Sequence, residues 1–352
     1  MKTPSARDPR RRSVHEGAQL QSRAWRIHSY SGFRGLTLDR VDIEEPGPTD
    51  IRIKVEAFAL NWGDTALMRD RYSFSFDSLP ARVGIEAAGI VDAVGEEVTD
   101  LSVGDRVSTL PYFYYNRGVS ADHVVVDRQY VTRPPANLST IESASIWMQY
   151  LTAYYPLAEI CRLGPGDAAL VTAATSTAGA AALEIGRELG VTMIGTTRSA
   201  DNIAYLRERG AADVIVTGVE DVAARITRIT GGRGVDLAFD SVGAGLIGQY
   251  VSVLARDAQI CYYGELDGGR PELPYPEMYQ KRAVFRAYSV FSYIEDREAR
   301  DRGIAFITDL LASGRIRPSV DRVFPMEQYV DAWEYLLGQR QTHGKVVIET
   351  GA

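Results

Sequence analysis

The sequence predicts an α/β protein with two structural units, and three observations lead to this fold class. Residues 23–129 hold short runs of alternating apolar and polar residues separated by glycines, which is typical of a small, partly open β-barrel. Strand-like and helix-like segments then alternate up to residue 290, which predicts a parallel sheet with right-handed crossovers. Within this part, residues 168–190 combine a buried strand, a tight turn of small residues and a helix that stops at Gly190.

The composition bounds the kind of protein. A chain of 352 residues is long enough for two domains, and a net charge of −7 argues against a general nucleic-acid binder. No apolar run approaches the roughly 18–20 residues that a membrane span needs. The only two cysteines, Cys161 and Cys261, lie in apolar segments, so we expect buried thiols in a reducing compartment, the cytoplasm.

Residues 1–22 differ from the rest of the chain. They are rich in arginine, contain two prolines and show no apolar stripe, so we expect a disordered tail. The segment lacks the hydrophobic region of a secretory signal, and Asp8 and Glu16 argue against a transit peptide.

The first unit is predicted from alternating strands. Residues 24–27 and 36–43 alternate like hairpin strands, and residues 51–57 alternate strictly. Because successive side chains of a strand point to opposite faces, Ile51, Ile53 and Val55 should share the buried face. Glycines punctuate the further short strands of this barrel.

The second unit follows a helix expected at residues 143–155. We expect its strands at residues 168–171, 191–197, 213–216, 235–239, 259–263 and 284–290, and its helices at residues 180–189, 201–209, 220–229, 244–254 and 297–312. The last elements, at residues 320–324, 327–337 and 345–348, should return to the first unit. Residues 284–290 should lie at the sheet edge, where a second copy of the chain could pair, so we expect a homodimer.

The turn at residues 173–179 has the features of a cradle for a dinucleotide pyrophosphate. Unpaired amides at a helix start face an anion, and small side chains let the backbone approach phosphates. We expect cofactor contacts from the turn residues Thr175, Ser176, Thr177, Ala178 and Gly179. Only Gly179 remains of the full G-x-G-x-x-G pattern, so an ordinary strand-to-helix turn is the alternative.

The end of the next strand indicates which dinucleotide binds. An NAD site places an acidic residue about 20 residues past the turn, on the ribose 2′-hydroxyl. Thr197, Arg198 and Ser199 stand there instead. A guanidinium with two hydroxyls suits a 2′-phosphate, so we predict NADPH rather than NADH. The alternative is that Arg198 is a solvated surface arginine.

Several motifs resemble the medium-chain dehydrogenase/reductase superfamily over residues 23–350. They are the glycine-rich pattern in residues 84–95 and the sequences Gly104-Asp105-Arg106-Val107, Asp240-Ser241-Val242-Gly243 and Gly344-Lys345-Val346-Val347. The resemblance implies a GroES-like substrate domain (residues 23–147 and 318–352) and a Rossmann domain with a doubly wound parallel sheet (residues 148–317). It also implies an active site in the cleft between them.

The same resemblance separates zinc enzymes from zinc-free reductases. The zinc enzymes have Cys where Asn61 stands and His where Ile85 stands. A catalytic zinc needs about three nitrogen, sulfur or carboxylate ligands. Asp64 and Glu86 alone would make a poor site, so we predict that no metal is bound.

What remains is a resemblance to NADPH:quinone oxidoreductases and enoyl reductases. It implies that Asn61, Asp64 and Tyr72 lie near the nicotinamide. It also implies cofactor contacts from residues of the matched motifs and strand ends, namely Thr152, Gly243, Tyr263, Gly264 and Lys345. The tyrosine-rich loop at residues 112–115 is unusual and suggests a particular substrate.

We therefore expect hydride transfer from NADPH to an electron-poor carbon–carbon double bond of a small molecule. The enolate that forms needs a hydrogen-bond donor and a proton. Tyr72 and Asn61 are the candidates, and Tyr115 is a third. The alternatives are that Tyr72 only packs the ring, that Asn61 fixes a turn or the ribose, and that Asp64 is a helix N-cap. The alternative functions are quinone reduction, zinc-free carbonyl reduction and non-catalytic NADPH binding.

Overall fold

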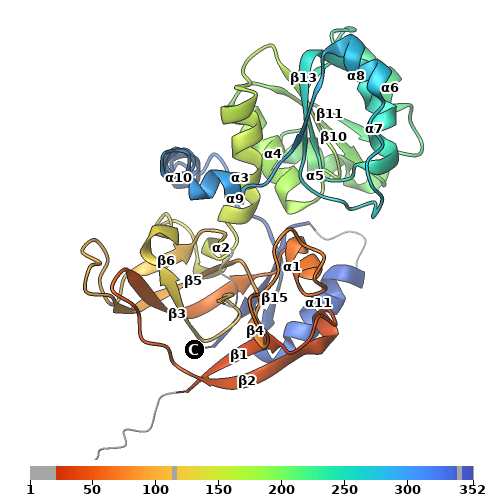
Figure 1. The fold of residues 1–352 in the computed structure, drawn as a ribbon. Coiled ribbons are helices and arrows are strands. Elements are labelled where there is room, and N and C mark those ends of the chain that lie inside the picture. Colours follow the sequence, from red (N-terminus) through yellow and green to blue (C-terminus); the bar gives the residue numbers. More distant parts are fainter. Residues whose placement is uncertain (1–20, 113–116, 339–342, 352) are drawn as a thin grey trace, which may run out of the picture.

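The computed structural model describes residues 21–112, 117–338 and 343–351. These residues form two units, drawn one above the other in Figure 1, with a parallel sheet and its helices in the upper unit and mainly antiparallel strands in the lower one. The predicted α/β fold class is confirmed. Short 3₁₀ or π turns lie at Phe33–Gly35, Arg128–Tyr130, Tyr155–Ile160, Ala200–Asn202, Val251–Val253 and Met326–Gln328.

The upper unit is a doubly wound sheet of six parallel strands. They are β9 (Ala168–Val171), β10 (Thr192–Thr197), β11 (Asp213–Val216), β12 (Val235–Asp240), β13 (Leu254–Tyr262) and β14 (Val284–Ala287), in the spatial order β11-β10-β9-β12-β13-β14. Helices α4 (Thr177–Glu188), α5 (Ile203–Glu208), α6 (Val222–Ile229), α7 (Ala244–Tyr250) and α8 (Tyr275–Lys281) connect them. The strand order reverses between β9 and β12, which is where such sheets bind ligands.

Both faces of this sheet are buried. Leu170, Ile194 and Ile215 pack in one apolar cluster, whereas their strand neighbours Ala169 and Met193 pack in the other. Alternate residues thus reach opposite cores, and this explains why the strands are nearly continuous apolar runs.

The lower unit is built around β3 (Asp50–Ala59). One sheet has the order β15 (Val320–Pro325), β16 (Lys345–Glu349), β3, β5 (Glu86–Val94), β6 (Arg106–Thr109) and β8 (Val131–Thr132), with β7 (His123–Asp127) also paired to β3. A smaller sheet has the order β2 (Leu36–Asp42), β1 (Gln21–Ile27) and β4 (Ala81–Arg82). Ile51, Ile53 and Val55 are fully buried, as expected. The pairing of β16 with β3 returns the C-terminal segment to this unit.

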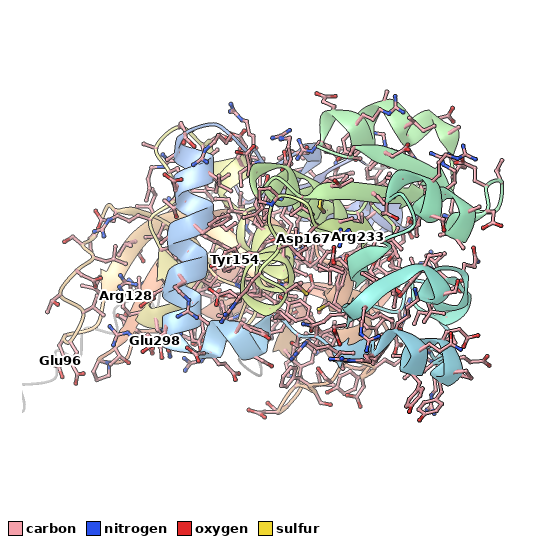
Figure 2. The ribbon with its side chains drawn as sticks, turned by 90° about the horizontal axis from the view of Figure 1, so that it is seen from above. Glu96, Arg128, Tyr154, Asp167, Arg233 and Glu298 are labelled. Atoms are coloured by element: carbon pink, nitrogen blue, oxygen red, sulfur yellow. The ribbon has the colours of Figure 1, made fainter. Side chains whose placement is uncertain are left out.

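Helices lie where the two units meet. They are α2 (Thr140–Ser143), α3 (Trp147–Tyr154), α9 (Phe291–Glu295) and α10 (Arg297–Ala312), while α1 (Trp62–Leu67) and α11 (Tyr329–Gly338) belong to the lower unit. Helix α10 is seen end-on in Figure 1 and lengthwise beside Tyr154 in Figure 2. The Tyr154 ring lies 4.9 Å from that of Phe306, and Arg302 pairs with Glu159 at 2.8 Å. These contacts hold α10 against the end of α3.

The structure differs from the sequence prediction mainly at element ends. Strand β1 begins at Gln21, inside the expected tail. Its first residues are polar, and they join the strand because Gln21 pairs with Asp42 of β2. The helix expected at 143–155 is α3, which covers only Trp147–Tyr154, and the helix expected at 244–254 ends at Tyr250. Strand β14 stops at Ala287, and it lies at the sheet edge as predicted.

Candidate functional site

The turn after β9 is shaped for close approach of the backbone. Ser176 is the N-cap of α4, and its Oγ accepts the N–H of Gly179 at 3.1 Å. A Cβ at Gly179 would lie only 2.8 Å from the Cα of Ala174, so only glycine lets α4 begin this close to the turn. Ala173 has a φ of 44°, in the left-handed region that residues other than glycine rarely adopt. The turn is thus held in a specific, compact conformation.

The other turn residues are placed to face an anion. Thr175, Thr177 and Ala178 are partly exposed at the start of α4. The N–H groups of Thr177 and Ala178 belong to the first helical turn, which offers them no backbone acceptor. Amides in this position and the positive end of the helix dipole favour negative charge.

Asp240 fixes the loop on the other side of the switch point. Its carboxylate accepts the hydroxyls of Thr172 and Tyr250, each at 2.7 Å. It also accepts the backbone N–H groups of Val242 at 2.8 Å and Gly243 at 3.1 Å. Gly243 has a φ of 68°, which favours glycine. The loop therefore has one conformation, set by a buried carboxylate.

Buried hydroxyl groups near this loop lack well-formed hydrogen bonds, among them those of Ser241 and Tyr263. The Oγ of Ser241 and the Oη of Tyr263 are buried and meet the geometry of a hydrogen bond with no described residue, although the Tyr263 phenol interacts with the hydroxyls of Ser241 and Ser176. The Tyr263 ring stacks on Phe239 with centroids 4.1 Å apart, and a Cβ at Gly264 would lie 3.3 Å from the Ser241 carbonyl oxygen. Buried polar atoms without well-formed hydrogen bonds are rare in proteins, and here they lie at the strand ends where ligands of doubly wound sheets bind.

The end of β10 carries the residues predicted to recognise the ribose. Thr197 is 5% exposed, whereas Arg198 is exposed and takes part in no ion pair within the described residues. The Oγ of Ser199 lies 3.0 Å from an oxygen of Asp201 and accepts the Asp201 N–H at 3.2 Å. The guanidinium of Arg198 is thus available to a ligand.

Two predicted cofactor contacts have their polar groups engaged inside the protein. The hydroxyl of Thr152 donates to the carbonyl oxygen of Met148 one turn earlier in α3. The ammonium of Lys345 lies 2.7 Å from Glu86 Oε1 and also donates to Asn61 Oδ1. Both groups therefore bond within the protein.

Glu86, Asn61 and Lys345 form a buried polar network. Besides Lys345, the Glu86 carboxylate accepts the backbone N–H of Met148 at 2.9 Å and Asn61 Nδ2 at 3.3 Å. Asn61 Nδ2 also lies 3.4 Å from the carbonyl oxygen of Ala59. Both amide protons of Asn61 are therefore engaged, which favours a role in fixing the local structure over donation to a substrate.

Asn61, not Asp64, is the N-cap of α1. Asp64 is the third helical residue, and its Oδ2 accepts the Asn61 N–H at 3.1 Å. The expectation that Asp64 is the N-cap is therefore wrong. Asp64 stands three residues after the N-cap, and its carboxylate accepts the N-cap amide, as in a capping box. Complete burial raises the pKa of Asp64 to about 7, although the amides of Asn61 and Gly84 and the Lys345 ammonium lower it.

Tyr72 lies beside α1. A Cβ at Gly63 would lie 3.3 Å from its ring, so glycine makes room for the tyrosine. Burial, together with the nearby Asp64, raises the pKa of Tyr72 to about 12. The phenol is therefore protonated at neutral pH, which is the state a proton donor needs.

An aromatic rim joins the two units beside this tyrosine. We give this name to Tyr72, Phe74 and Phe291. The centroids of Tyr72 and Phe74 are 6.3 Å apart in a stacked arrangement, and those of Phe74 and Phe291 are 6.5 Å apart, edge to face. Phe291 begins α9, so side chains of both units form the rim. Tyr115, the third catalytic candidate, lies outside the described residues.

No group of three or more His, Cys, Asp or Glu side chains that could hold a metal ion occurs in the described part of the chain. Where the zinc enzymes are expected to bind their metal, Glu86 is already paired with an ammonium. A cation there would be repelled by Lys345. Both cysteines are free thiols. None of the helices in the described ranges has the length and apolar character of a membrane crossing.

Several residues that shape the site were not predicted from the sequence. Asp240 could have been suspected as an acidic residue directly after an apolar strand. Sequence spacing could not predict that Phe291 contacts Phe74 or that Glu86 pairs with Lys345. Each of these contacts joins segments far apart in the chain.

Two family profiles match the chain. The alcohol dehydrogenase GroES-like domain matches residues 47–136, and the zinc-binding dehydrogenase domain matches residues 209–348. The second description refers to metal binding, but the described residues hold no cluster of metal ligands.

Several curated proteins of similar sequence are named as reductases or oxidoreductases. A 2-haloacrylate reductase from a Burkholderia species is 28% identical over 92% of this chain and 97% of the relative. A quinone oxidoreductase from Pseudomonas aeruginosa is 29% identical over 91% of this chain and 97% of its own. The crystal structure of Escherichia coli quinone oxidoreductase complexed with NADPH is similar with a TM-score of 0.84 and 26% identity, covering 94% of this chain and all of that one.

Proposed function

This chain belongs to the medium-chain dehydrogenase/reductase superfamily, in its quinone oxidoreductase-like branch, and from this membership we propose that it is an NADPH-dependent reductase. Its reaction is hydride transfer to an activated carbon–carbon double bond of a small molecule. The observation that carries the proposal is the site at the switch point of the sheet, where a shaped turn, a fixed loop and two buried hydroxyls without well-formed hydrogen bonds meet.

The residues at the switch point fit NADPH. The first turn of α4 and the hydroxyls of Thr175 and Thr177 would hold the pyrophosphate, since the close packing at Gly179 leaves the amides accessible. The exposed Arg198 would bind the ribose 2′-phosphate. Ser241 and Tyr263 would gain the well-formed hydrogen bonds that they lack in the protein. The bound cofactor supplies the hydride, and the protein supplies position and electrostatics.

The chain's own residues would complete the reduction. When hydride adds to the β-carbon of an enone, negative charge develops on the carbonyl oxygen, and the α-carbon must receive a proton. Tyr72 is protonated at neutral pH and can supply that proton. Asn61 acts by holding Lys345 and Glu86 in place.

Quinone reduction is the second candidate, and the aromatic rim favours it. A flat acceptor can stack between aromatic side chains that come from both units. Two of the similar proteins described above are quinone oxidoreductases. Enones and quinones both accept hydride on a conjugated system, so one site can serve either.

We propose that the enzyme works without zinc. The Lys345–Glu86 pair places a positive charge where the zinc enzymes of the superfamily are expected to bind their metal. Another buried carboxyl, Asp64, uses its Oδ2 to accept the Asn61 amide.

We also propose a cytoplasmic homodimer. Strand β14 forms an open edge of the parallel sheet, and exposed apolar side chains lie beside it, with Tyr275 and Tyr279 more than 70% exposed. An edge strand next to an apolar surface favours pairing with a second copy. The free thiols suit the reducing cytoplasm.

A spectrophotometric screen of NADPH oxidation tests the proposed function. Enones, enals, enoyl thioesters, 2-haloacrylate and quinones should be offered as acceptors, with simple ketones and aldehydes as the carbonyl control. We expect turnover with conjugated acceptors, unaffected by a metal chelator, in protein that elemental analysis finds free of zinc. Stoichiometric zinc would contradict the metal-free mechanism, and NADPH binding without any turnover would show a non-catalytic binding protein.

A further inference from the structure

His343 lies against the loop that follows β10, although it belongs to the segment that returns to the lower unit. Its imidazole stacks on the ring of Tyr205 with centroids 4.0 Å apart and planes only 4° from parallel. Its Nε2 lies 2.8 Å from Asn202 Oδ1. Tyr205 and Asn202 both belong to the upper unit, at the start of the α5 region. One side chain of the lower unit is thus fixed to the upper unit by a stack and a hydrogen bond.

The contact continues to the end of β10. Asn202 is 5% exposed, and its Nδ2 donates to Thr197 Oγ1 at 2.9 Å. Since Nδ2 faces the threonine, Oδ1 faces the imidazole and accepts its Nε2–H. Thr197 Oγ1 also accepts the backbone N–H of Ser199 at 3.3 Å. His343 therefore ends a chain of hydrogen bonds that fixes the conformation of residues 197–202.

The lower unit in turn fixes His343. Its backbone N–H lies 3.4 Å from Asp321 Oδ1, and the other oxygen of this carboxylate accepts the hydroxyl of Tyr335 at 2.9 Å. Asp321 belongs to β15 and Tyr335 to α11. The position of the imidazole is thus set by two elements that have no part in the parallel sheet.

We propose that His343 is a positioning residue for recognition of the ribose 2′-phosphate, and that through it the lower unit contributes to the choice of NADPH over NADH. The inference rests on the proposed NADPH function. In doubly wound sheets the end of the second strand reads the ribose 2′ substituent. Here that strand end is Thr197, and the exposed Arg198 follows it directly. The Asn202–His343 pair holds the loop from which Arg198 and Ser199 project.

The test measures ligand binding alone, so that it does not depend on catalysis. Binding of adenosine 2′,5′-bisphosphate and of ADP, and of NADPH and NADH, is measured by calorimetry for three variants. H343F keeps a ring to stack on Tyr205 but loses the donor. H343Q keeps an N–H donor for Asn202. H28F, the control, makes the same histidine-to-phenylalanine change at the exposed His28, which lies beside Asp39.

We expect H343F to bind adenosine 2′,5′-bisphosphate and NADPH about tenfold more weakly, which corresponds to about 1.4 kcal/mol. ADP and NADH should bind as to the wild type, because they lack the 2′-phosphate. H343Q should recover most of the affinity, and H28F should behave as the wild type. Unchanged ADP and NADH binding also shows that H343F is folded.

Other results would overturn the inference in distinguishable ways. If H343F keeps the wild-type preference for the 2′-phosphate, His343 has no such role and the proposed function stands. Equal losses for ligands with and without the phosphate would show a purely structural role. If the wild type binds neither NADPH nor NADH, the proposed function fails and the inference fails with it.

Discussion

The ammonium of Lys345 lies 2.7 Å from the carboxylate of Glu86, and both side chains are at least 97% buried. Lys345 is on β16 and Glu86 on β5, on either side of the end of β3, where Ala59 is paired with Glu86. The same carboxylate binds the first turn of α3 through the Met148 amide. The ion pair thus ties two strands and the helix that leads into the upper unit.

Replacing Lys345 with methionine should strongly destabilise the protein. Removing one partner of a buried ion pair leaves an uncompensated charge, which costs about 3–5 kcal/mol. Urea unfolding of K345M should show this loss. In the double variant K345M/E86Q no charge is left unpaired, so much of the stability should return. A K345M protein as stable as the wild type would contradict the assigned burial of the pair.

Asp64 should make stability fall as pH rises. Its pKa rises from 3.8 to about 7 on burial, so between these values the folded protein holds more protons than the unfolded chain. The free energy of unfolding must then decrease with pH across this window, by at most about 1.4 kcal/mol per pH unit for one group. Glu184, also raised to about 7 by burial, acts in the same direction.

Urea unfolding of D64N between pH 4 and 8 measures this contribution. The slope should become shallower than in the wild type, and the remaining slope should diminish further in D64N/E184Q. An unchanged slope in D64N would show that the carboxyl does not titrate across this range.

Replacing Tyr72 with phenylalanine should lower turnover far more than NADPH affinity. The change removes the phenolic proton but keeps the ring that packs beside Gly63 and Phe74. Loss of a positioned general acid typically costs about 10²–10⁴-fold in rate. Steady-state kinetics with an enone and calorimetric NADPH binding separate the two effects. If turnover is unchanged, Tyr72 is only an aromatic wall. With a quinone acceptor the effect should be smaller, because its reduced oxygens take protons readily from water.

Replacing Arg198 with glutamate should reverse the preference for the phosphorylated cofactor. A carboxylate repels the 2′-phosphate, whereas it can accept a hydrogen bond from the ribose 2′-hydroxyl of NADH. We expect the ratio of NADPH to NADH affinity to fall by at least about tenfold, a shift of about 1.4 kcal/mol. R207E, an equivalent change at an exposed arginine of α5, is the control. Equal behaviour of R198E and R207E would leave Arg198 as a solvated surface residue.

A charge on the edge strand should break the proposed dimer. Val284 opens β14 and is 45% exposed, so V284E would bring two carboxylates together if two copies pair along this edge. Light scattering should give a mass near twice 38.7 kDa for the wild type and near 38.7 kDa for V284E. V219E, at a residue 81% exposed elsewhere in the upper unit, should remain dimeric. A monomeric wild type would refute the dimer directly.

Much of the fold could be predicted because its signals are local. The strand at residues 168–171, the strand at 213–216 and the helix at 297–312 have the predicted bounds, since each is a run with clear periodicity and a turn at its ends. The ends of elements were less predictable. Pairing with another strand sets where β1 begins, at Gln21, and α7 ends at Tyr250 because a tighter 3₁₀ turn follows it.

The candidate site was predicted only in outline. The turn residues and Arg198 could be placed because they follow strands in sequence. Three contacts could not be predicted: Asn61 with Glu86, Lys345 with Glu86, and His343 with Asn202. Each of them joins residues at least 25 positions apart in the sequence.

The amino-acid sequence alone determined the alternation of strands and helices, the small-residue turn and the lack of cysteine and histidine at the positions of the zinc ligands. These follow from the order of residues along the chain, whose effects act over a few positions. Tertiary structure alone decided which polar groups are free and which are paired. The buried ammonium of Lys345 is paired with Glu86, and His343 of the lower unit contacts the loop after β10. Packing brings together side chains that lie far apart in the sequence.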